Sequence, residues 1–577
     1  MAVLPRAPSQ AELKDQLFSP PPQALNPAWN PGLVEALLSQ WWGLQAGFHR
    51  LQFEDQQVIL TLCLGPRHKV LRELDFQADL VFWDGQTEDL KQVAKLCRRG
   101  ARLLWPKTNA FMNSSLAAAE PAEQKTRLQA VGFVLPELTQ TETWSVTYDP
   151  RWEPRRAPPL VNPWGEVPPP TEPVLVIGAG LSGAACARAL ADRGWSVTVL
   201  DAAPEPATVG SGLPVGIFGP HFSKDDGRLS QITRHGVRHT WQAAQRGLQQ
   251  GVDWSPTGVL EHRLHGRAGV DSLVSEISRT TSTHPEHLFS HEATQVQKQS
   301  LGLLEQAPVT WHPYAGWIKP PALVRLLLNH PLIDFRRHCP VLSLVRSETR
   351  AWQALNSEGQ PLAESRWVIL AGGPFSPSLL PQTSAQRVAL DAVRGQVTWA
   401  ETNDPRHWPA IPVNGHGSLI AQIPTDAPSS SSGKDVSNGR PQTAWYTGAT
   451  FDRRPGQPDW ASLDHLNQAT PVAALDTQKN LKKLQSLLPQ LPALPDQTES
   501  ALKAWASIRC TSPDRLPWVG PVDEEHLPGL WLCTAMGARG LSWALLCADL
   551  LGSWATGEPL PLEAAHARAL LASRNRR

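Results

Sequence analysis

The sequence predicts an α/β protein whose large second module begins with a dinucleotide-binding βαβ unit. Over 174–201 a buried strand, a glycine-rich turn, an alanine-rich helix and a second buried strand follow one another. A second strand, glycine turn and helix pattern occupies 530–551, near the end of the chain. A proline-rich segment separates these elements from a smaller N-terminal module, so we expect two modules, 1–149 and 174–577, with a linker at 150–173.

Composition excludes several classes of protein. The 577 residues are 41% hydrophobic and 18% charged, which is an ordinary globular balance. The 53 basic and 53 acidic residues cancel, so a basic whole-chain surface for nucleic acid is absent, although a local patch is compatible with this balance. The seven cysteines are scattered without a C-x-x-C pair, which argues against a disulfide framework and a metal site.

Targeting signals are also missing from the sequence. The first residues lack the apolar core of a signal peptide, and no run of 18 apolar residues predicts a membrane helix. We therefore expect a cytoplasmic protein without a membrane partner.

Two segments have the composition of connections. Nine of the 24 residues at 150–173 are proline, which excludes helix and central strand and predicts an extended linker. Serine, glycine and asparagine dominate 426–442, which predicts a disordered surface loop between two strands.

The glycine turn of the βαβ unit carries the pattern of a pyrophosphate site. Gly178 permits the tight turn, Gly180 allows close approach of a phosphate, and Gly183 lets the helix pack on the strand. Asp201 ends the second strand, where a carboxylate accepts hydrogen bonds from an adenosine ribose. The predicted cofactor-binding residues of this unit are Gly178, Ala179, Gly180, Leu181, Ser182, Gly183 and Asp201. The motif by itself does not separate NAD from FAD.

The C-terminal pattern offers a second helix N-terminus to the same ligand. Gly537 and Gly540 mark its turn, and the positive end of the helix dipole there would stabilise a reduced flavin ring. The cofactor-binding residues predicted in this turn are Gly537, Ala538, Arg539, Gly540 and Leu541.

Six ordered segments of the large module resemble the glycine oxidase and D-amino-acid oxidase family of FAD enzymes. They are GSGLPVGIFGPHFSKDD (210–226), HPYAGWIKPPALVRLLL (312–328), VRGQVTW (393–399), WYTGATFDRR (445–454), IRCTSPDRLPWVGPV (508–522) and AMGARGLSWALLCADLL (535–551). Within that family they are most similar to members that modify tRNA and are fused to a methyltransferase.

The resemblance implies a fold and an activity. It implies FAD-binding parts at about 174–260, 320–380 and 505–560, with an antiparallel-sheet substrate part inserted at about 261–319 and 381–504. FAD would take a hydride from the carbon beside the secondary amine of a carboxymethylaminomethyl group on wobble uridine in tRNA. Hydrolysis would then free glyoxylate and leave aminomethyl-uridine. Further cofactor contacts are implied at Ser211, Gly212, Gly216, Val341 and Gly372.

The implied substrate carries a carboxylate, which requires a fixed cation. Arg509 occupies the family's clamp position, and arginine can bind a carboxylate through two parallel hydrogen bonds. Lys224 and Arg394 are weaker candidates that also suit a solvated or phosphate-facing position. Tyr446, together with Trp317, is a candidate wall of the substrate pocket, although aromatic residues more often fill a core.

The N-terminal module resembles the C-terminal part of an S-adenosylmethionine methyltransferase. The segment ADLVFWDG (78–85) resembles the strand that ends in the family's motif aspartate, here Asp84. No paired glycine loop precedes Phe53, and Asp84 is not followed by the family's phenylalanine–alanine–proline run. We therefore expect a truncated Rossmann-like remnant that has lost S-adenosylmethionine and the methyltransferase activity, with Asp84 as a structural residue.

The remnant has a second candidate role, which is to hold tRNA. The arginines that suggest it are Arg98, Arg99, Arg102, Arg151, Arg155 and Arg156. Two other functions stay open at this point: a free-amino-acid oxidase or dehydrogenase of the same fold, and a non-catalytic tRNA-binding protein with a flavin fold. The tRNA reading also implies a functional link to the enzymes that install the carboxymethylaminomethyl group.

Overall fold

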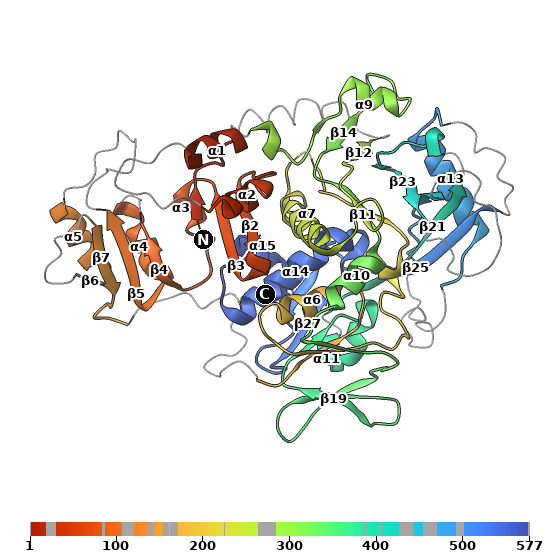
Figure 1. Ribbon diagram of the computed structural model, residues 1–577. Coiled ribbons are helices and arrows are strands. Elements are labelled where there is room, and N and C mark those ends of the chain that lie inside the picture. Colours follow the sequence, from red (N-terminus) through yellow and green to blue (C-terminus); the bar gives the residue numbers. More distant parts are fainter. Residues whose placement is uncertain are drawn as a thin grey trace.

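The computed structural model describes most of the chain (Figure 1). The described residues are 2–18, 30–83, 87–106, 121–135, 143–153, 161, 171–223, 225–263, 284–385, 388–402, 405–425, 442–453, 470–491 and 501–574. Lys224, Asp84, Arg155, Arg156 and the loop expected at 426–442 lie wholly or almost wholly outside these ranges, so the predictions made for them remain untested.

A six-stranded sheet forms the centre of the molecule, with strand order β16-β9-β8-β20-β27-β26. Its strands are β8 (Val174–Ile177), β9 (Val197–Leu200), β16 (Ile333–Arg336), β20 (Val368–Leu370), β26 (Trp518–Pro521) and β27 (Leu530–Thr534). All neighbouring pairs are parallel except β26 with β27. The short apolar strands β8, β9 and β20 are buried throughout, as expected for a parallel sheet covered on both faces.

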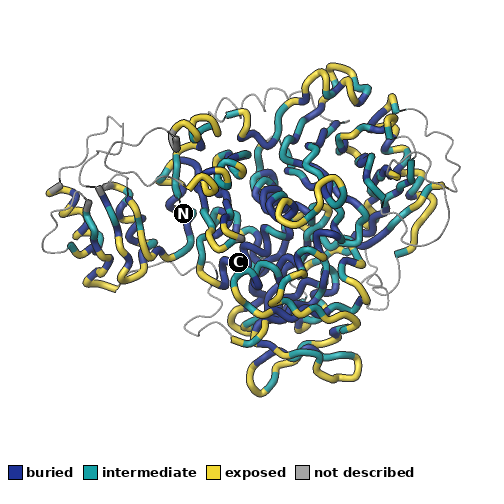
Figure 2. Tube along the Cα trace, viewed as in Figure 1, coloured by how far each residue is buried: buried dark blue, intermediate teal, exposed yellow. Residues whose placement is uncertain are grey.

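Different layers cover the two faces of this sheet. One face packs against α6 (Leu181–Ala191) and α14 (Gly540–Thr556), which in turn contact α10 (Pro320–Leu328) and α7 (Arg228–Gly247). The other face packs against a meander of β17 (Ser343–Arg346), β18 (Trp352–Leu355) and β19 (Pro361–Ser365). Figure 2 shows the buried residues concentrated in this central part.

An eight-stranded sheet lies beside the central one. Its order is β13-β14-β12-β22-β23-β24-β21-β25. Its strands are β12 (Val259–His262), β13 (His291–Glu292), β14 (Val309–His312), β21 (Asp391–Thr402), β22 (Val413–Gly415), β23 (Gly417–Pro424), β24 (Thr443–Gly448) and β25 (Lys503–Thr511). Helix α13 (Ala474–Leu487) packs on one face of β21, β23 and β24. A small sheet of β10 (Gly216–Phe218), β15 (Gly316–Ile318) and β11 (Trp254–Ser255) completes this half.

The N-terminal module contains two separate sheets. The first contains β1 (Ala2–Leu4), β2 (Gly47–Phe53) and β3 (Val58–Leu64), with helices α1 (Gln10–Phe18) and α2 (Pro31–Ser39). The second contains β4 (Ala78–Phe82), β5 (Cys97–Pro106), β6 (Phe133–Val134) and β7 (Thr143–Tyr148), with α4 (Leu90–Leu96) and α5 (Pro121–Ala130). The first sheet packs against α7 of the large module, whereas the second projects from the molecule (Figure 1).

The described helices were compared with the length and apolarity that a membrane-spanning helix requires. Over the described ranges, none of them combines the length and the apolar run that a bilayer-spanning helix requires.

Candidate functional site

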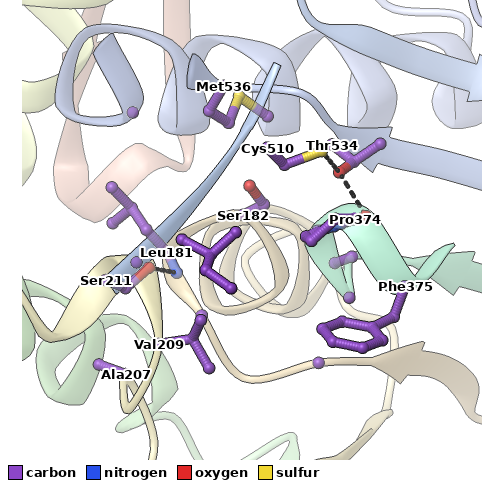
Figure 3. Close-up of a pocket in the computed structure, with 18 of the residues that line it drawn as sticks. Leu181, Ser182, Ala207, Val209, Ser211, Pro374, Phe375, Cys510, Thr534 and Met536 are labelled. Atoms are coloured by element: carbon purple, nitrogen blue, oxygen red, sulfur yellow. Dashed lines mark hydrogen bonds between the residues drawn. The ribbon is translucent and has the colours of Figure 1, made fainter. Parts of the chain in front are cut away.

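A cavity of about 320 Å³ lies at the carboxyl ends of β8, β20 and β27. The N-terminus of α6, the turn η5 (Gly373–Leu379) and the turn η9 (Gly537–Arg539) border it, as does η3 (Gly210–Gly212). Figure 3 shows Leu181 and Ser182 at the start of α6, with Pro374 and Phe375 on the facing η5. The carboxyl edge of a parallel sheet is the usual ligand site of such folds.

The glycines of the βαβ turn are required by close backbone contacts. Gly178 has φ +106°, and a Cβ there would lie 2.8 Å from the Ala371 carbonyl oxygen. A Cβ on Gly183 would lie only 1.8 Å from the Gly178 carbonyl oxygen, so any side chain would push α6 off the strand. These contacts give Gly178 and Gly183 the structural roles that the motif predicts.

Two helix N-termini open toward the cavity without a capping side chain on their N-cap residues. Gly180 is the N-cap of α6, and Arg539 is the N-cap of α14. The Leu181 N–H donates to Ser211 Oγ over 2.8 Å, which ties the helix start to η3 (Figure 3). The other first-turn N–H groups and the positive dipole ends together suit a pyrophosphate and an electron-rich ring.

Asp201 lies at the end of β9 and holds the turn together. Its carboxylate accepts the Ala179 N–H over 2.5 Å and the Ala203 N–H over 2.8 Å. Burial raises the pKa of this carboxyl and is the largest influence, while the two N–H donors oppose it. Each carboxylate oxygen can accept more than one hydrogen bond, so Asp201 remains free to accept from a ribose hydroxyl at the cavity wall.

Most of the predicted cofactor residues line this cavity. Those that do are Gly178, Gly180, Leu181, Ser182, Asp201, Ser211, Gly216, Val341, Gly372, Gly537, Ala538, Gly540 and Leu541. Ala179, Gly183, Gly212 and Arg539 lie beside it without lining it. The cavity fits FAD, because two helix N-termini, glycine-containing turns and the Asp201 carboxylate border it.

Other lining residues were not predicted from the sequence. They include Gly373, Pro374, Phe375, Cys510 and Met536. The paired glycines that follow β20 in the segment AGGPF are a signal that could have identified the η5 residues, because glycines after a buried parallel strand often mark a ligand site.

Arg509 lines the same cavity from β25. Its Nη1 donates to the Thr450 carbonyl oxygen over 3.2 Å, and its guanidinium lies 4.6 Å from the ring centroid of Phe451. No carboxylate pairs with it among the residues that the structure describes. Burial lowers the pKa of Arg509 to about 10. A buried cation without a counter-charge favours an anionic ligand, because that ligand would offset the cost of desolvation.

Gly395 makes room for this guanidinium. A Cβ at position 395 would lie 1.8 Å from Nη1 of Arg509. Strand register explains the contact, because Val393 of β21 pairs directly with Arg509 and Gly395 is the next residue on the same face. The sequence segment VRGQVTW therefore carries a glycine whose role depends on the neighbouring strand.

A second cation lies near Arg509. Lys483 of α13 donates from Nζ to the Ala449 carbonyl oxygen over 2.8 Å. Its pKa is lowered, first by burial and then by the charge of Arg509. The segment Ala449 to Phe451 is thus held between two positive side chains.

Arg394, Tyr446 and Trp317, the other substrate candidates that the structure describes, do not line the cavity. Arg394 is buried on the α13 face of β21, where Nη1 pairs with Asp476 Oδ2 at 2.5 Å. Tyr446 stacks on Trp399 with ring centroids 5.4 Å apart and packs in a cluster with Trp317. The structure therefore gives Arg394 a structural ion pair and gives Tyr446 and Trp317 packing contacts beside the site.

Two of the candidate tRNA-binding arginines that the structure describes form ion pairs with acidic residues. Arg98 pairs with Asp79 at 3.0 Å, and Arg99 pairs with Asp149 at 2.6 Å. These exposed ion pairs reduce the positive charge available for a phosphate backbone.

The fold and the cavity define a dinucleotide-binding oxidoreductase, and the family comparison agrees. The model of the FAD dependent oxidoreductase family matches residues 173–554. A model of an S-adenosyl-L-methionine-dependent methyltransferase family matches residues 31–87.

Relatives of known name identify the family within the FAD-dependent oxidoreductases. A protein of Polaromonas sp. strain JS666 is 39% identical over 567 residues, covering 93% of this chain and 81% of the relative. A protein of Verminephrobacter eiseniae strain EF01-2 is 39% identical over 585 residues, covering 93% and 86%. Both are named tRNA 5-methylaminomethyl-2-thiouridine biosynthesis bifunctional protein MnmC. The chain belongs to the MnmC family, within the FAD-dependent oxidoreductases.

Solved structures show the same fold at low identity. Glycine oxidase from Geobacillus kaustophilus matches with a TM-score of 0.52 at 16% identity, covering 70% of this chain and 98% of that one. Glycine oxidase from Bacillus cereus matches with a TM-score of 0.50 at 18% identity, covering 67% and 95%.

Proposed function

We propose that this protein oxidises the carboxymethylaminomethyl group on wobble uridine in tRNA, giving aminomethyl-uridine and glyoxylate. The observation that carries the proposal is Arg509, a buried guanidinium without an acidic partner in the described chain, at the wall of the dinucleotide cavity. The names of relatives that are 39% identical over nearly the whole chain support a tRNA substrate. Such a substrate implies a cytoplasmic enzyme that works after those that install the carboxymethylaminomethyl group.

The chemistry divides between cofactor and protein. FAD, when bound, supplies the two-electron acceptor for the hydride on the carbon beside the amine. Arg509 would hold the substrate carboxylate through charge-assisted hydrogen bonds and so fix that carbon. The buried cavity wall would exclude water during the oxidation, and hydrolysis of the resulting imine would release glyoxylate. A substrate amine that arrives neutral needs no protein base.

We also propose that the N-terminal module no longer methylates the product. The methyltransferase model matches only residues 31–87, and the module is divided into two sheets. The paired-glycine loop that would cradle S-adenosylmethionine is missing before Phe53. The expected product is therefore aminomethyl-uridine whether or not S-adenosylmethionine is present.

A nucleoside analysis tests both proposals. Purified protein is incubated with tRNA that carries the carboxymethylaminomethyl group, with and without S-adenosylmethionine. The tRNA is then digested, and its nucleosides are separated by chromatography and identified by mass spectrometry. We expect aminomethyl-uridine in both arms. Unchanged tRNA would refute the oxidation, whereas methylaminomethyl-uridine only in the second arm would show an active methyltransferase.

Substitution of Arg509 tests the clamp. Hydrogen bonds to charged groups contribute about 1.5–3 kcal/mol, so Arg509→Ala should raise KM about ten- to hundredfold while the protein keeps its flavin. Arg509→Lys should recover part of the loss, because it restores the charge without the planar fork. Arg325→Ala, on an exposed position of α10, is the matched control and should behave as wild type. An unchanged KM in Arg509→Ala would refute the clamp.

A further inference from the structure

Phe451 is a large apolar side chain exposed beside the carboxylate clamp. Its exposed fraction is 59%, whereas the preceding Thr450 is buried at 4%. Isolated exposed hydrophobic residues are common, so exposure by itself carries no function. Phe451 differs from such residues because its ring contacts Arg509, which lines the cavity.

The backbone around Phe451 is fixed on both sides. Thr450 donates its N–H to the Gln396 carbonyl oxygen over 3.1 Å. Asp452 and Arg394 exchange two backbone hydrogen bonds of 2.9 and 3.1 Å. Phe451 therefore lies across from Gly395, on the face of the sheet that carries Arg509.

One face of the ring is already occupied. The Arg509 guanidinium carbon lies 4.6 Å from the ring centroid, which is within cation–π distance. Because Gly395 has no side chain, the guanidinium occupies the space that a Cβ at that position would take. Much of the residue is open to solvent, since its exposed fraction is 59%, and Phe451 lies next to Arg509 without lining the cavity itself.

The proposed substrate places a flat ring close to this position. Its carboxylate is joined to C5 of uracil by only a methylene, a nitrogen and a second methylene. A carboxylate held on Arg509 therefore brings the uracil ring to the immediate surroundings of the guanidinium, where Phe451 lies. Proteins that bind unpaired bases stack them on aromatic side chains, and Lys483 adds positive charge nearby for a phosphate.

We infer that Phe451 is a specificity-determining residue that stacks on the uracil of the wobble nucleotide and so selects a nucleoside-borne glycine over the free amino acid. The inference rests on the proposed function, since it assigns the base-recognition contact of that substrate. It explains why an exposed position next to a charge clamp carries a phenylalanine.

The test compares aromatic and non-aromatic residues at one position. KM and kcat for the modified tRNA are measured for wild type, Phe451→Ala, Phe451→Leu and Phe451→Trp, with flavin content as a check of folding. Base stacking on one aromatic residue is worth a factor of about five to a hundred by alanine substitution. We expect KM to rise at least fivefold in both Phe451→Ala and Phe451→Leu, to stay near wild type in Phe451→Trp, and kcat to change less than twofold.

The leucine variant separates stacking from packing. Leucine fills most of the volume without a π face, so a wild-type KM in Phe451→Leu would show that Phe451 only supports Arg509 and would overturn the inference. An unchanged KM in Phe451→Ala would overturn it as well. Val472→Ala, at an exposed apolar position with a relative exposure of 57%, is the matched control and should leave KM unchanged.

A binding measurement keeps the two proposals distinguishable. A fluorescently labelled anticodon stem-loop carrying the modified uridine is titrated with the same proteins, and anisotropy gives Kd without turnover. If wild type leaves tRNA unchanged, the proposed function fails, and equal Kd values across the set would overturn the stacking contact independently. If wild type modifies tRNA and the variants match it, only the inference on Phe451 fails.

Discussion

Gly395 and Arg509 show how a missing side chain on one strand shapes the site on the next. The guanidinium occupies the volume that a Cβ at position 395 would need. Arg509 contacts the Phe451 ring and donates a hydrogen bond to the Thr450 carbonyl oxygen. Gly395 has no side chain that could contact a ligand. Its proposed role is therefore to leave room for the Arg509 guanidinium and so to position it.

We expect Gly395→Ala to displace Arg509 and to raise KM about tenfold or more, since it weakens charge-assisted hydrogen bonds worth about 1.5–3 kcal/mol. The flavin cradle lies on other elements, so flavin content should stay at the wild-type level. Steady-state kinetics with modified tRNA and the ratio of flavin to protein absorbance measure the two effects. Val397→Ala, on the same face of β21, controls for disturbance of the strand. A wild-type KM in Gly395→Ala would contradict the positioning role.

At the scale of elements, α7 connects the N-terminal module to the flavin module. Among its buried residues are His235, Arg238, His239 and Gln242, which is an unusual number of polar groups for a buried helix face. Gln242 donates to the Arg50 carbonyl oxygen, and His239 contacts Asp549 of α14 at 3.0 Å. The helix therefore joins two layers through hydrogen bonds as well as apolar packing.

His235 gives this helix a sensitivity to acid. Burial lowers its pKa to about 3 and outweighs Glu563, which raises it. Histidine in an unfolded chain titrates near 6.5, so below that pH the unfolded state binds more protons than the folded state. The stability contributed by neutral His235 is complete above about pH 6.5 and is lost progressively as pH falls from 6.5 toward 3, by up to about 1.4 kcal/mol per pH unit.

Urea unfolding at several pH values between 7.5 and 5 measures this dependence. His235→Gln has no titrating group at this position, and the free energy of unfolding should fall less steeply with acid than in wild type. The pKa of neighbouring His49 is also lowered by burial, so part of the dependence should remain. His526→Gln, at an exposed position, is the control. Equal slopes in His235→Gln and wild type would contradict the assignment.

At the scale of the whole molecule, the first N-terminal sheet is a structural part of the oxidoreductase. Arg50 of β2 is buried at 2% exposure and donates to Ser553 Oγ of α14 over 2.8 Å. It also lies 3.6 Å from Asp549 and 3.7 Å from Glu558. On the opposite side of the contact, Arg238 of α7 stacks on Trp42 at 4.3 Å and donates to the Gln40 carbonyl oxygen. The first N-terminal sheet therefore contributes buried polar contacts to the large module, although the module lacks the methyltransferase loop.

We expect Arg50→Ala to destabilise both modules together, by about 3 kcal/mol, because removing one partner leaves buried carboxylates less compensated. Tryptophan and flavin fluorescence followed in the same denaturant titration should shift to lower midpoints by the same amount. Arg127→Ala, which removes an exposed pair with Glu123, should cost less than about 1 kcal/mol. A flavin transition unaffected by Arg50→Ala would show that the two modules are energetically independent.

The sequence by itself determined the βαβ turn from Gly178 to Asp201 and the second glycine turn at Gly537. These features are local, because the spacing of glycines, strand and helix is set by contacts within a short segment of chain. The resemblance to the family added Arg509 as the candidate clamp, and the structure places this residue at the wall of the cavity.

The tertiary structure alone decided what surrounds each of the two candidate arginines. Arg394 and Arg509 lie on paired strands, but the register places Val393 opposite Arg509 and so turns Arg394 to the other face, toward Asp476. Register, the space above Gly395 and the docking of Arg50 all depend on residues far apart in the chain. Their side chains meet only after the sheets and helices have packed, so no local pattern in the sequence specifies them.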